Sequence, residues 1–241
     1  MTTRKDQNMP PLILPAIHHL DEETSLSEVL IARSLGCAGA LLIEMNGRDE
    51  QLDAPAVRAK KAWPDGIIGT NRLRSAPADA VLRDAELGLD ATWTDDCGIH
   101  SRFGSPNVEK RLAEAFYAVR ERKPKQLLFA SVAFKTQAAE PRPGDVAARA
   151  AANGWIATTS GAATGSPPDV EKLRSMRQAM ANDPRTANEG RLAVASGIDP
   201  YNVASLGKEV DFIIVATGIG RDFHHIDVDK LRRLVLVANG L

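Results

Sequence analysis

RLAVASG, from Arg191 to Gly197, is a continuous apolar run that ends in small residues. The segment Asp199-Pro200-Tyr201-Asn202 behind it predicts the start of a helix. The pattern repeats at once, because the apolar run from Asp211 to Gly218 ends in Thr217-Gly218 and precedes another helical segment. Strands that are apolar on both faces and alternate with helices are typical of a parallel sheet covered by helices.

The same alternation extends outward through the rest of the chain. The other expected strands are Pro11–His18, Ala40–Met45, Gly66–Arg72, Asp90–Asp95, Gln126–Phe134 and Trp155–Thr159. The other expected helices are Ser25–Leu35, Pro55–Trp63, Ala76–Leu87, Asn107–Arg122, Gly144–Ala152, Asp169–Ala181 and Asp227–Ala238. Strict alternation of eight strands with eight helices predicts an α/β protein with a single (β/α)8 TIM barrel, and an open doubly wound sheet is the alternative.

Capping residues predict where several helices begin. Ser25 and Glu28 have the spacing of a capping box. Ser105 followed by Pro106 is typical of an N-cap and a first helical residue, and Asp227 is expected to cap the last helix.

The barrel accounts for nearly the whole chain. We expect a flexible N-terminus over residues 1–10 and one barrel domain over residues 11–241. Residues 178–191 are interpreted as a surface connection, and residues 136–143 as an active-site flap.

Composition narrows the class of protein. The chain has 241 residues, the length of one such barrel, with 44% hydrophobic and 25% charged residues. A net charge of -1 argues against nucleic acid as the main partner. Two cysteines, a polar N-terminus and the lack of a long apolar run predict a cytoplasmic protein with no membrane span. Because barrels of this size often self-associate, we expect a homodimer.

Small residues after the last three strands predict a phosphate site. In barrels of this type the turns after strands seven and eight usually hold a phosphate group, and small residues let backbone N–H groups approach an anion. Pro200 at a first helical position is expected to leave neighbouring N–H groups free. The alternative is that each glycine only relieves a tight turn. The phosphate-binding candidates are Gly161, Thr164, Gly165, Ser196, Gly197, Thr217 and Gly218.

Polar residues at the other strand ends are candidates for catalysis, because the carboxyl ends of the strands form the functional face of a barrel. They are His18, Glu44, Asn71, Asp95, Asp96 and Lys135. Since side chains alternate along a strand, only one of Asp95 and Asp96 is expected to face the mouth as a general acid or base. The alternative is that one aspartate caps the next turn.

Lys135 and Glu44 each leave two interpretations open. Lys135 ends an apolar strand and is expected to bind an anion, the alternative being a neutral nucleophilic amine. Glu44 needs a partner for its charge, and Arg72 on the neighbouring strand is the nearest candidate. A structural ion pair is as reasonable there as a role in catalysis.

All five histidines are predicted to lie at the carboxyl ends of the strands. This clustering favours a functional site, because histidines with structural roles would be more evenly distributed. The five histidines are His18, His19, His100, His224 and His225. A metal site would need three or four converging ligands, for which His18, His225 and either Glu44 or Asp95 are candidates. No spacing motif demands that set, so we expect no metal and no cofactor. Cys97 at a strand end is interpreted as an inert thiol rather than a nucleophile.

Several motifs resemble those of a known family. TSGAATGSP (Thr159–Pro167), ASGIDPYNV (Ala195–Val203), GTNRLR (Gly69–Arg74) and IDVD (Ile226–Asp229) are similar to segments of the BtpA-like (SgcQ-like) proteins. That family belongs to the ribulose-phosphate-binding barrel superfamily. The resemblance implies a phosphosugar-type ligand, and a role in photosystem I assembly gave the family its name.

The chain also departs from the family's pattern. Where strand five of the family ends Asp-x-x-x-Lys-His, this chain has Ser131 to Thr136, keeping only Lys135. After the first strand, Leu20-Asp21-Glu22 replaces a Pro/Gly-rich stretch. These departures favour either a different reaction or a non-catalytic protein.

We therefore expect an enzyme that acts on a small phosphorylated compound, either a sugar phosphate or a ribonucleotide, by isomerase, lyase or glycosyl-transfer chemistry. One alternative is a non-catalytic assembly or regulatory protein of the BtpA-like type. The other is a metal-dependent hydrolase that uses the histidines.

Overall fold

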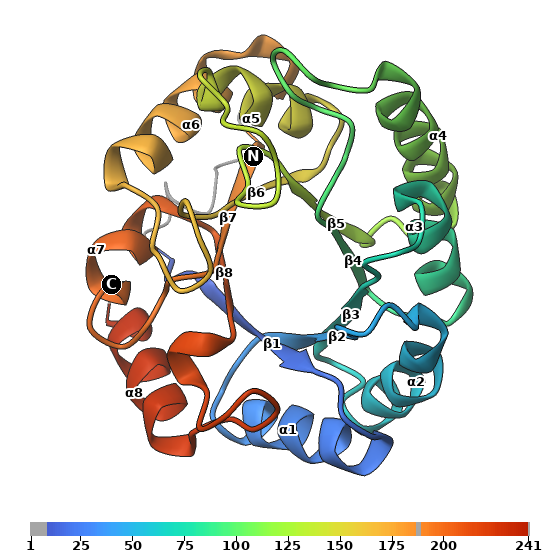
Figure 1. Cartoon of the computed structure of the whole chain (residues 1–241), viewed down its shortest axis with the longest axis vertical. Coiled ribbons are helices and arrows are strands. Elements are labelled where there is room, and N and C mark those ends of the chain that lie inside the picture. The colour runs from blue at the N-terminus through green and yellow to red at the C-terminus, as the bar shows by residue number, and fades with distance from the viewer. Residues whose placement is uncertain (1–8, 187–188, 241) are drawn as a thin grey trace.

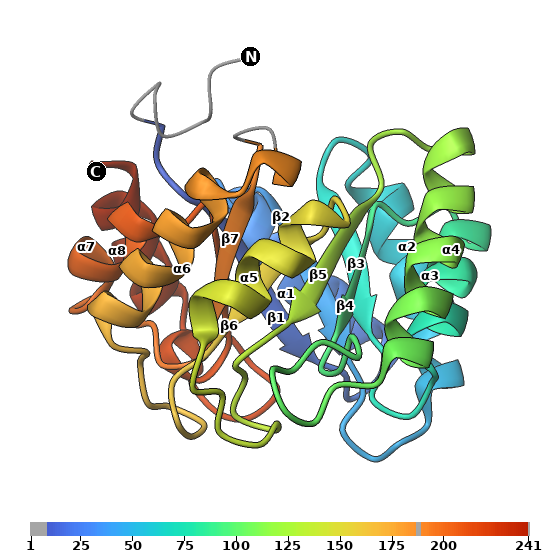
Figure 2. The same ribbon diagram turned by 90° about the horizontal axis from the view of Figure 1, so that it is seen from above.

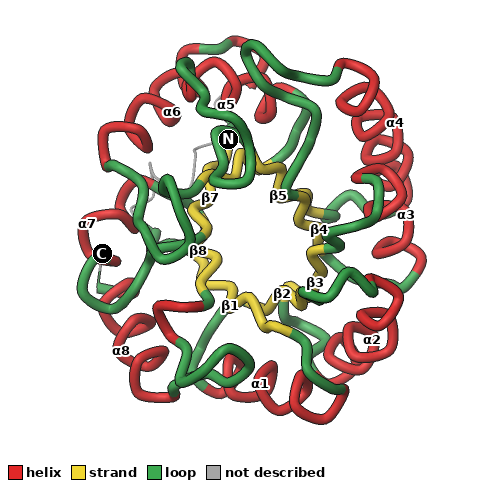
Figure 3. The backbone as a smooth tube through the Cα atoms, in the orientation of Figure 1, coloured by secondary structure: helices red, strands yellow, loops and turns green. Residues whose placement is uncertain are grey.

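Within the described residues, 9–186 and 189–240, the strands form one closed parallel barrel in which β8 pairs with β1 (Figure 1). The computed structural model has strands β1 (Leu12–His18), β2 (Gly39–Ile43), β3 (Ile67–Asn71), β4 (Ala91–Thr94), β5 (Leu127–Ser131), β6 (Ile156–Thr159), β7 (Arg191–Ala195) and β8 (Phe212–Val215). Figure 3 shows them as an inner ring surrounded by helices. The predicted (β/α)8 barrel is confirmed.

A helix follows each strand. The helices are α1 (Glu22–Ser34), α2 (Asp53–Ala62), α3 (Pro77–Glu86), α4 (Pro106–Arg122), α5 (Pro143–Ala152), α6 (Val170–Asn182), α7 (Val203–Leu206) and α8 (Val228–Asn239). Short 3₁₀ turns are η2 (Asp49–Leu52), η3 (Pro184–Thr186), η4 (Gly207–Glu209) and η5 (Thr217–Ile219). Most of the expected flexible N-terminus, residues 1–8, lies outside the described residues, as does residue 241.

The strands are buried on both faces, which explains their continuous apolar runs. Along β8, Phe212 and Ile214 belong to the cluster inside the barrel, whereas Ile213 and Val215 pack in the layer between barrel and helices. Phe129 of β5 meets Phe212 edge to face, with ring centroids 5.2 Å apart. The barrel interior is therefore a packed core.

Two of the three predicted helix starts are confirmed. Ser105 occupies the N-cap position of α4, and Asp227 caps α8 by accepting from two backbone amides. The predicted capping box of α1 is wrong, because Asp21 is the N-cap and accepts from the Thr24 amide at 2.7 Å. Ser25 and Glu28 lie inside that helix.

Strand β5 and helix α6 differ from their expected bounds. β5 ends at Ser131 rather than Phe134, because Ala133 adopts a left-handed φ of 48° that an extended strand cannot include. Lys135 therefore lies in a turn beyond the strand. The predicted surface connection over 178–191 begins as the last turn of α6, which continues to Asn182. Residues 187–188 of it lie outside the described residues.

All the strands point the same way, so the loops that follow them lie at one end of the barrel. Figure 2 shows these loops together at the lower edge in the side view. This end is the functional face of a parallel barrel. No helix within residues 9–186 and 189–240 combines the length and the apolar character that crossing a membrane requires.

Candidate functional site

A cavity of about 310 Å³ lies at the carboxyl ends of the strands. From the first half of the barrel, its polar lining residues are His18, Asn71 and Asp95. From the second half, they are Lys135, Thr136, Thr164, Ser196 and Thr217. The remaining wall is mostly apolar and includes Met45, Leu73, Trp93, Phe134 and Phe223. The cavity thus brings together four of the six catalytic candidates and three of the seven phosphate candidates.

Asp95 and Asn71 form the polar centre of this cavity. Asn71 ends β3, and Asp95 directly follows β4. Asn71 Nδ2 donates to Asp95 Oδ1 over 3.1 Å. Burial raises the pKa of the Asp95 carboxyl above its ordinary value, while the Asn71 hydrogen bond and the charge of Lys135 oppose the rise. A carboxyl held in this way can exchange a proton with a ligand near neutral pH more readily than an exposed aspartate.

Asn71 also carries an unused acceptor. The residue is 1% exposed, and its Oδ1 has no hydrogen-bond partner among the described residues. Because a buried carbonyl oxygen without a partner is unfavourable, a ligand hydroxyl or N–H at this point would gain the interaction.

Asp96 has a different environment from its neighbour. Its side chain is exposed and does not line the cavity, and its Oδ1 accepts from the Gly98 amide at 2.8 Å. One aspartate of the pair thus faces the barrel mouth while the other holds the following turn.

Lys135 reaches the cavity from the turn after β5. Its backbone amide donates to Ser160 Oγ at 2.9 Å, and its Nζ donates to Thr164 Oγ1 at 3.2 Å. Burial lowers the pKa of the Lys135 amine, and the charge of Asp95 opposes this effect. The Lys135 amine thus lies at the mouth of the cavity, where its contact with Thr164 is with a neutral hydroxyl.

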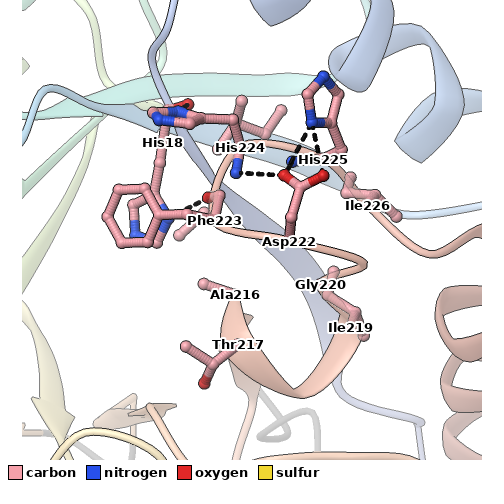
Figure 4. A pocket seen from close by; sticks show the side chains of 12 residues that line it. His18, Ala216, Thr217, Ile219, Gly220, Asp222, Phe223, His224, His225 and Ile226 are labelled. Carbon is pink, nitrogen blue, oxygen red and sulfur yellow. Dashed lines mark hydrogen bonds and ion pairs between the residues drawn. The ribbon is translucent and has the colours of Figure 1, made fainter.

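His18 is fixed by the loop that follows β8. Its ring stacks on Phe223 with centroids 4.1 Å apart, and its Nδ1 donates to the Phe223 carbonyl oxygen at 2.8 Å (Figure 4). Burial lowers the pKa of His18, and the nearby His224 and Lys135 lower it further against the effect of the backbone hydrogen bond. A neutral His18 would present Nε2 as an acceptor.

The phosphate candidates divide into hydroxyls and glycines. Thr164, Ser196 and Thr217 line the cavity, whereas Gly197 and Gly218 do not. A Cβ added to Gly197 would come within 2.2 Å of Pro167 N, and one on Gly218 within 1.9 Å of Ile198 O. These two glycines therefore allow neighbouring loops to pack against each other.

The two glycine candidates in the loop after β6, Gly161 and Gly165, also lie outside the cavity. A Cβ on Gly161 would come within 2.1 Å of Ser166 O, so this glycine likewise permits close loop packing. Gly165 has a left-handed φ of 80°, and its amide donates to Ser196 Oγ at 3.2 Å. That bond places the Ser196 hydroxyl, which lines the cavity.

The prediction of free amides around Pro200 is wrong. The amides of Tyr201 and Asn202 donate to Asp199 Oδ1 at 2.7 and 3.0 Å. The Asp199 amide in turn donates to Asn202 Oδ1 at 2.9 Å. The turn thus satisfies its own donors, and α7 is only one turn long.

The predicted pairing of Glu44 with Arg72 is also wrong. Glu44 is buried and accepts from the amides of Asn46 and Arg48 at 2.9 and 2.7 Å. Burial raises the pKa of Glu44, but these hydrogen bonds outweigh it and leave the pKa below its ordinary value. Arg72 instead forms ion pairs with Asp84 at 2.9 Å and Asp53 at 2.8 Å.

The remaining histidines are engaged separately. His225 Nδ1 contacts Asp222 at 2.7 Å, His19 Nδ1 contacts Ser25 Oγ at 2.8 Å, and His224 Nδ1 donates to the His18 carbonyl oxygen at 3.0 Å. Both ring nitrogens of His100 are taken by backbone groups. Over the part of the chain that the structure describes, His, Cys, Asp and Glu residues form no group of three that could hold a metal ion.

Cys97 is a buried residue of the loop after β4. Its Sγ lies 3.3 Å from the Ser131 carbonyl oxygen, and burial raises the pKa of its thiol to about 12. Since the thiolate is the nucleophilic form, Cys97 is placed as an inert thiol.

Three aromatic wall residues, Trp93, Phe134 and Phe223, were not expected at the site. Trp93 lines the cavity beside Asp95, with its Nε1 donating to Ser131 Oγ at 3.0 Å. Residues 93 and 95 are two apart, and strand alternation places such residues on one face, so this signal was present in the sequence. Phe223 is 52% exposed and lies in an irregular loop, where no periodicity could have indicated its position.

No protein-family model matches the chain, and no curated protein matches it either. Several solved structures, by contrast, match the chain. Phosphoribosyl anthranilate isomerase in complex with reduced 1-(o-carboxyphenylamino)-1-deoxyribulose 5-phosphate has a TM-score of 0.64 and 13% identity, covering 96% of this chain and 100% of its own. 3-Hexulose-6-phosphate synthase has a TM-score of 0.66 and 12% identity, covering 94% and 99%.

A third similar structure is KGPDC from Streptococcus mutans, with a TM-score of 0.65 and 13% identity, covering 94% of this chain and 97% of that one. The first two of these structures are named as enzymes of phosphorylated sugars. At such low identity, the similarity establishes the fold that they share with this chain.

Proposed function

We propose that this protein is an enzyme that acts on a small phosphorylated compound, a sugar phosphate or a ribonucleotide, by acid–base chemistry. The observation that carries the proposal is the partly buried Asp95 carboxyl, which is hydrogen-bonded to Asn71 in a cavity that also holds Lys135. A carboxyl with a raised pKa beside a cation is the arrangement that proton transfer next to a developing oxyanion requires.

Each cavity residue takes a role that its contacts allow. Asp95 transfers the proton. Asn71 orients a ligand hydroxyl through its unpartnered Oδ1, and Lys135 stabilises developing negative charge. Glu44 has both carboxylate oxygens bonded to backbone amides, so in our proposal it shapes the loop after β2.

The phosphate group is assigned to the opposite side of the cavity. The hydroxyls of Thr164, Ser196 and Thr217 lie there, and η5 begins at Thr217. Hydroxyls, a lysine and backbone amides are the groups that bind phosphate in proteins. The similar structures lend support, since the phosphoribosyl anthranilate isomerase was solved with a bound 5-phosphate compound.

A thermal-shift screen tests the binding half of the proposal. Ribose 5-phosphate, ribulose 5-phosphate and nucleoside monophosphates are compared with ribose as the unphosphorylated control. At a hundred times its Kd, a ligand should raise Tm by about 5–10 °C for a protein of this size. If phosphorylated and unphosphorylated compounds behave alike, the proposal fails.

Proton transfer is tested without knowledge of the product. A compound that binds is incubated with the protein in D₂O, and loss of its C–H signals is followed by NMR. We expect Asp95→Asn to abolish exchange while sparing binding, and the matched variant Asp96→Asn to retain exchange. Equal exchange in both variants would show that Asp95 does not transfer the proton.

A further inference from the structure

A second pocket opens beside the cavity, between the loop from β5 to α5 and the loop from β6 to α6. This side pocket has a volume of about 470 Å³. Phe134 and Lys135 line both the cavity and the side pocket, whereas Lys172 and Gly161 line only the side pocket. The cavity and the side pocket therefore share a wall that Phe134 and Lys135 form.

Two lysines line the side pocket, and Lys172 is the one that does not also line the cavity. It belongs to the first turn of α6, and its Nζ donates to the carbonyl oxygens of Ala133 at 2.7 Å and Ser160 at 2.9 Å. An ammonium group has three N–H donors, and the third has no acceptor among the described residues. One donor of a half-buried cation is therefore available to a ligand.

The carboxylates of the side pocket do not neutralise this cation. Glu140 accepts from the amides of Ser101 and Arg142, and Asp169 accepts from the Glu171 amide as the N-cap of α6. Within residues 9–186 and 189–240, Lys172 forms no ion pair with either of them. Since a half-buried charge without a counter-charge is unfavourable, pairing with the Lys172 ammonium would favour the binding of an anion in the side pocket.

Burial lowers the pKa of the Lys172 amine to about 8. The amine is therefore mostly charged at neutral pH, and a bound anion would keep it so.

We propose that the side pocket binds a second anionic group, a carboxylate or a phosphate, at Lys172. Together with the cavity it then holds a ligand that carries an anion at each end. This inference rests on the proposed function, because the cavity must take the first phosphate. It narrows the substrate class from any small phosphate ester to phosphorylated compounds with a second anionic group.

Calorimetric titration of the whole protein with three probes tests the inference. Ribose 5-phosphate carries one anionic group, ribulose 1,5-bisphosphate carries two phosphates, and 6-phosphogluconate carries a phosphate and a carboxylate. We expect at least one of the two-anion probes to bind about tenfold more tightly than ribose 5-phosphate, since a charge-assisted hydrogen bond has about that effect. Which of them does so distinguishes phosphate from carboxylate.

Substitutions assign the effect to Lys172. Lys172→Met should remove the advantage of the two-anion probe and leave the Kd of ribose 5-phosphate nearly unchanged, while Lys172→Arg should retain part of the advantage. Lys208→Met, at an exposed lysine elsewhere, is the matched control. Because Lys172 also ties two loops together, Ala162→Glu serves as a second variant. It adds a carboxylate to the rim of the side pocket, keeps the lysine, and should weaken only the two-anion probe.

The outcomes separate this inference from the function on which it rests. Binding of ribose 5-phosphate with no advantage for either two-anion probe would overturn the second anion site and leave the proposed function standing. A Lys172→Met variant that weakens all three probes equally would show a structural lysine and would also overturn the site. If none of the three probes binds, the assigned phosphate site itself fails.

Discussion

Asn71 donates from Nδ2 to Oδ1 of Asp95 over 3.1 Å, while the carbonyl oxygen of the same Asn71 amide is buried without a partner among the described residues. The nitrogen and the oxygen of the Asn71 side-chain amide thus have different roles. The nitrogen stabilises the ionised Asp95 carboxyl, and the oxygen is left for a ligand.

Replacing Asn71 should therefore change two quantities at once. In Asn71→Ala the pKa of Asp95 should rise further, because the hydrogen bond that lowers it is lost. Ligand affinity should fall by about tenfold, the usual effect of one buried hydrogen bond. An NMR titration of the Asp95 carboxyl and the Kd of the bound sugar phosphate measure the two effects. An unchanged Asp95 pKa would contradict the coupling.

Asp95 should also cost the protein stability at neutral pH. Because burial raises its folded-state pKa above the ordinary 3.8, its contribution to folding is fully present below 3.8 and is lost as pH rises through the folded pKa. Asp95→Asn should accordingly raise Tm at pH 7, by about 2–4 °C for each 1 kcal/mol gained.

The difference in Tm between Asp95→Asn and the wild type should shrink as the pH falls through the raised pKa of Asp95, because the wild-type carboxyl then becomes protonated as well. Asp96→Asn, on the exposed neighbour, should leave Tm nearly unchanged across the same range. A stabilisation that does not depend on pH would contradict the assignment.

The stack of His18 on Phe223 predicts a titration shift. Phe223→Ala exposes the His18 ring, so the pKa of His18 should rise toward its ordinary 6.5, since burial is the main cause of its lowering. An NMR titration of the His18 ring proton follows this shift. A fall in the His18 pKa would mean that loss of the hydrogen bond to the residue 223 carbonyl, which raises the pKa, outweighs the loss of burial.

A buried ionic network supports the strands that carry the site. Asp84 accepts from the hydroxyls of Thr70 and Thr92 and from Arg72 Nε, each within 2.9 Å. Asp84→Asn removes one of the two carboxylates that pair with the buried Arg72, so unfolding by urea should show a loss of about 3–5 kcal/mol. The exposed pair of Lys110 and Glu114 offers a control, since Glu114→Gln should cost less than about 1 kcal/mol.

Much of the fold could be predicted from the sequence, because apolar strand runs, helical segments and their alternation are local patterns. Part of the site could be predicted for the same reason. Alternation limited the Asp95–Asp96 pair to one residue facing the mouth, although the sequence did not say which.

Contacts between distant segments could not be predicted in this way. The partners of Arg72 lie 12 and 19 residues away on helices, where they are set by how those helices pack on the barrel. The early end of β5 depends on an alanine with positive φ, for which the sequence carries no local signal. Lys135 was consequently placed at a strand end when it lies in the turn beyond.

The last prediction separates packing from ligand binding at the loops after β7 and β8. Gly218→Ala should lower Tm, because its Cβ would come within 1.9 Å of the Ile198 carbonyl oxygen and the loops must move apart. Thr217→Val, one residue earlier, keeps the shape of the side chain but removes a hydroxyl that lines the cavity, so it should weaken phosphate-ester binding at nearly unchanged Tm. Thermal melts and titrations with ribose 5-phosphate measure both effects. If Thr217→Val binds as tightly as the wild type, this hydroxyl does not hold the phosphate group, and the assignment would rest on Ser196 and Thr164 alone.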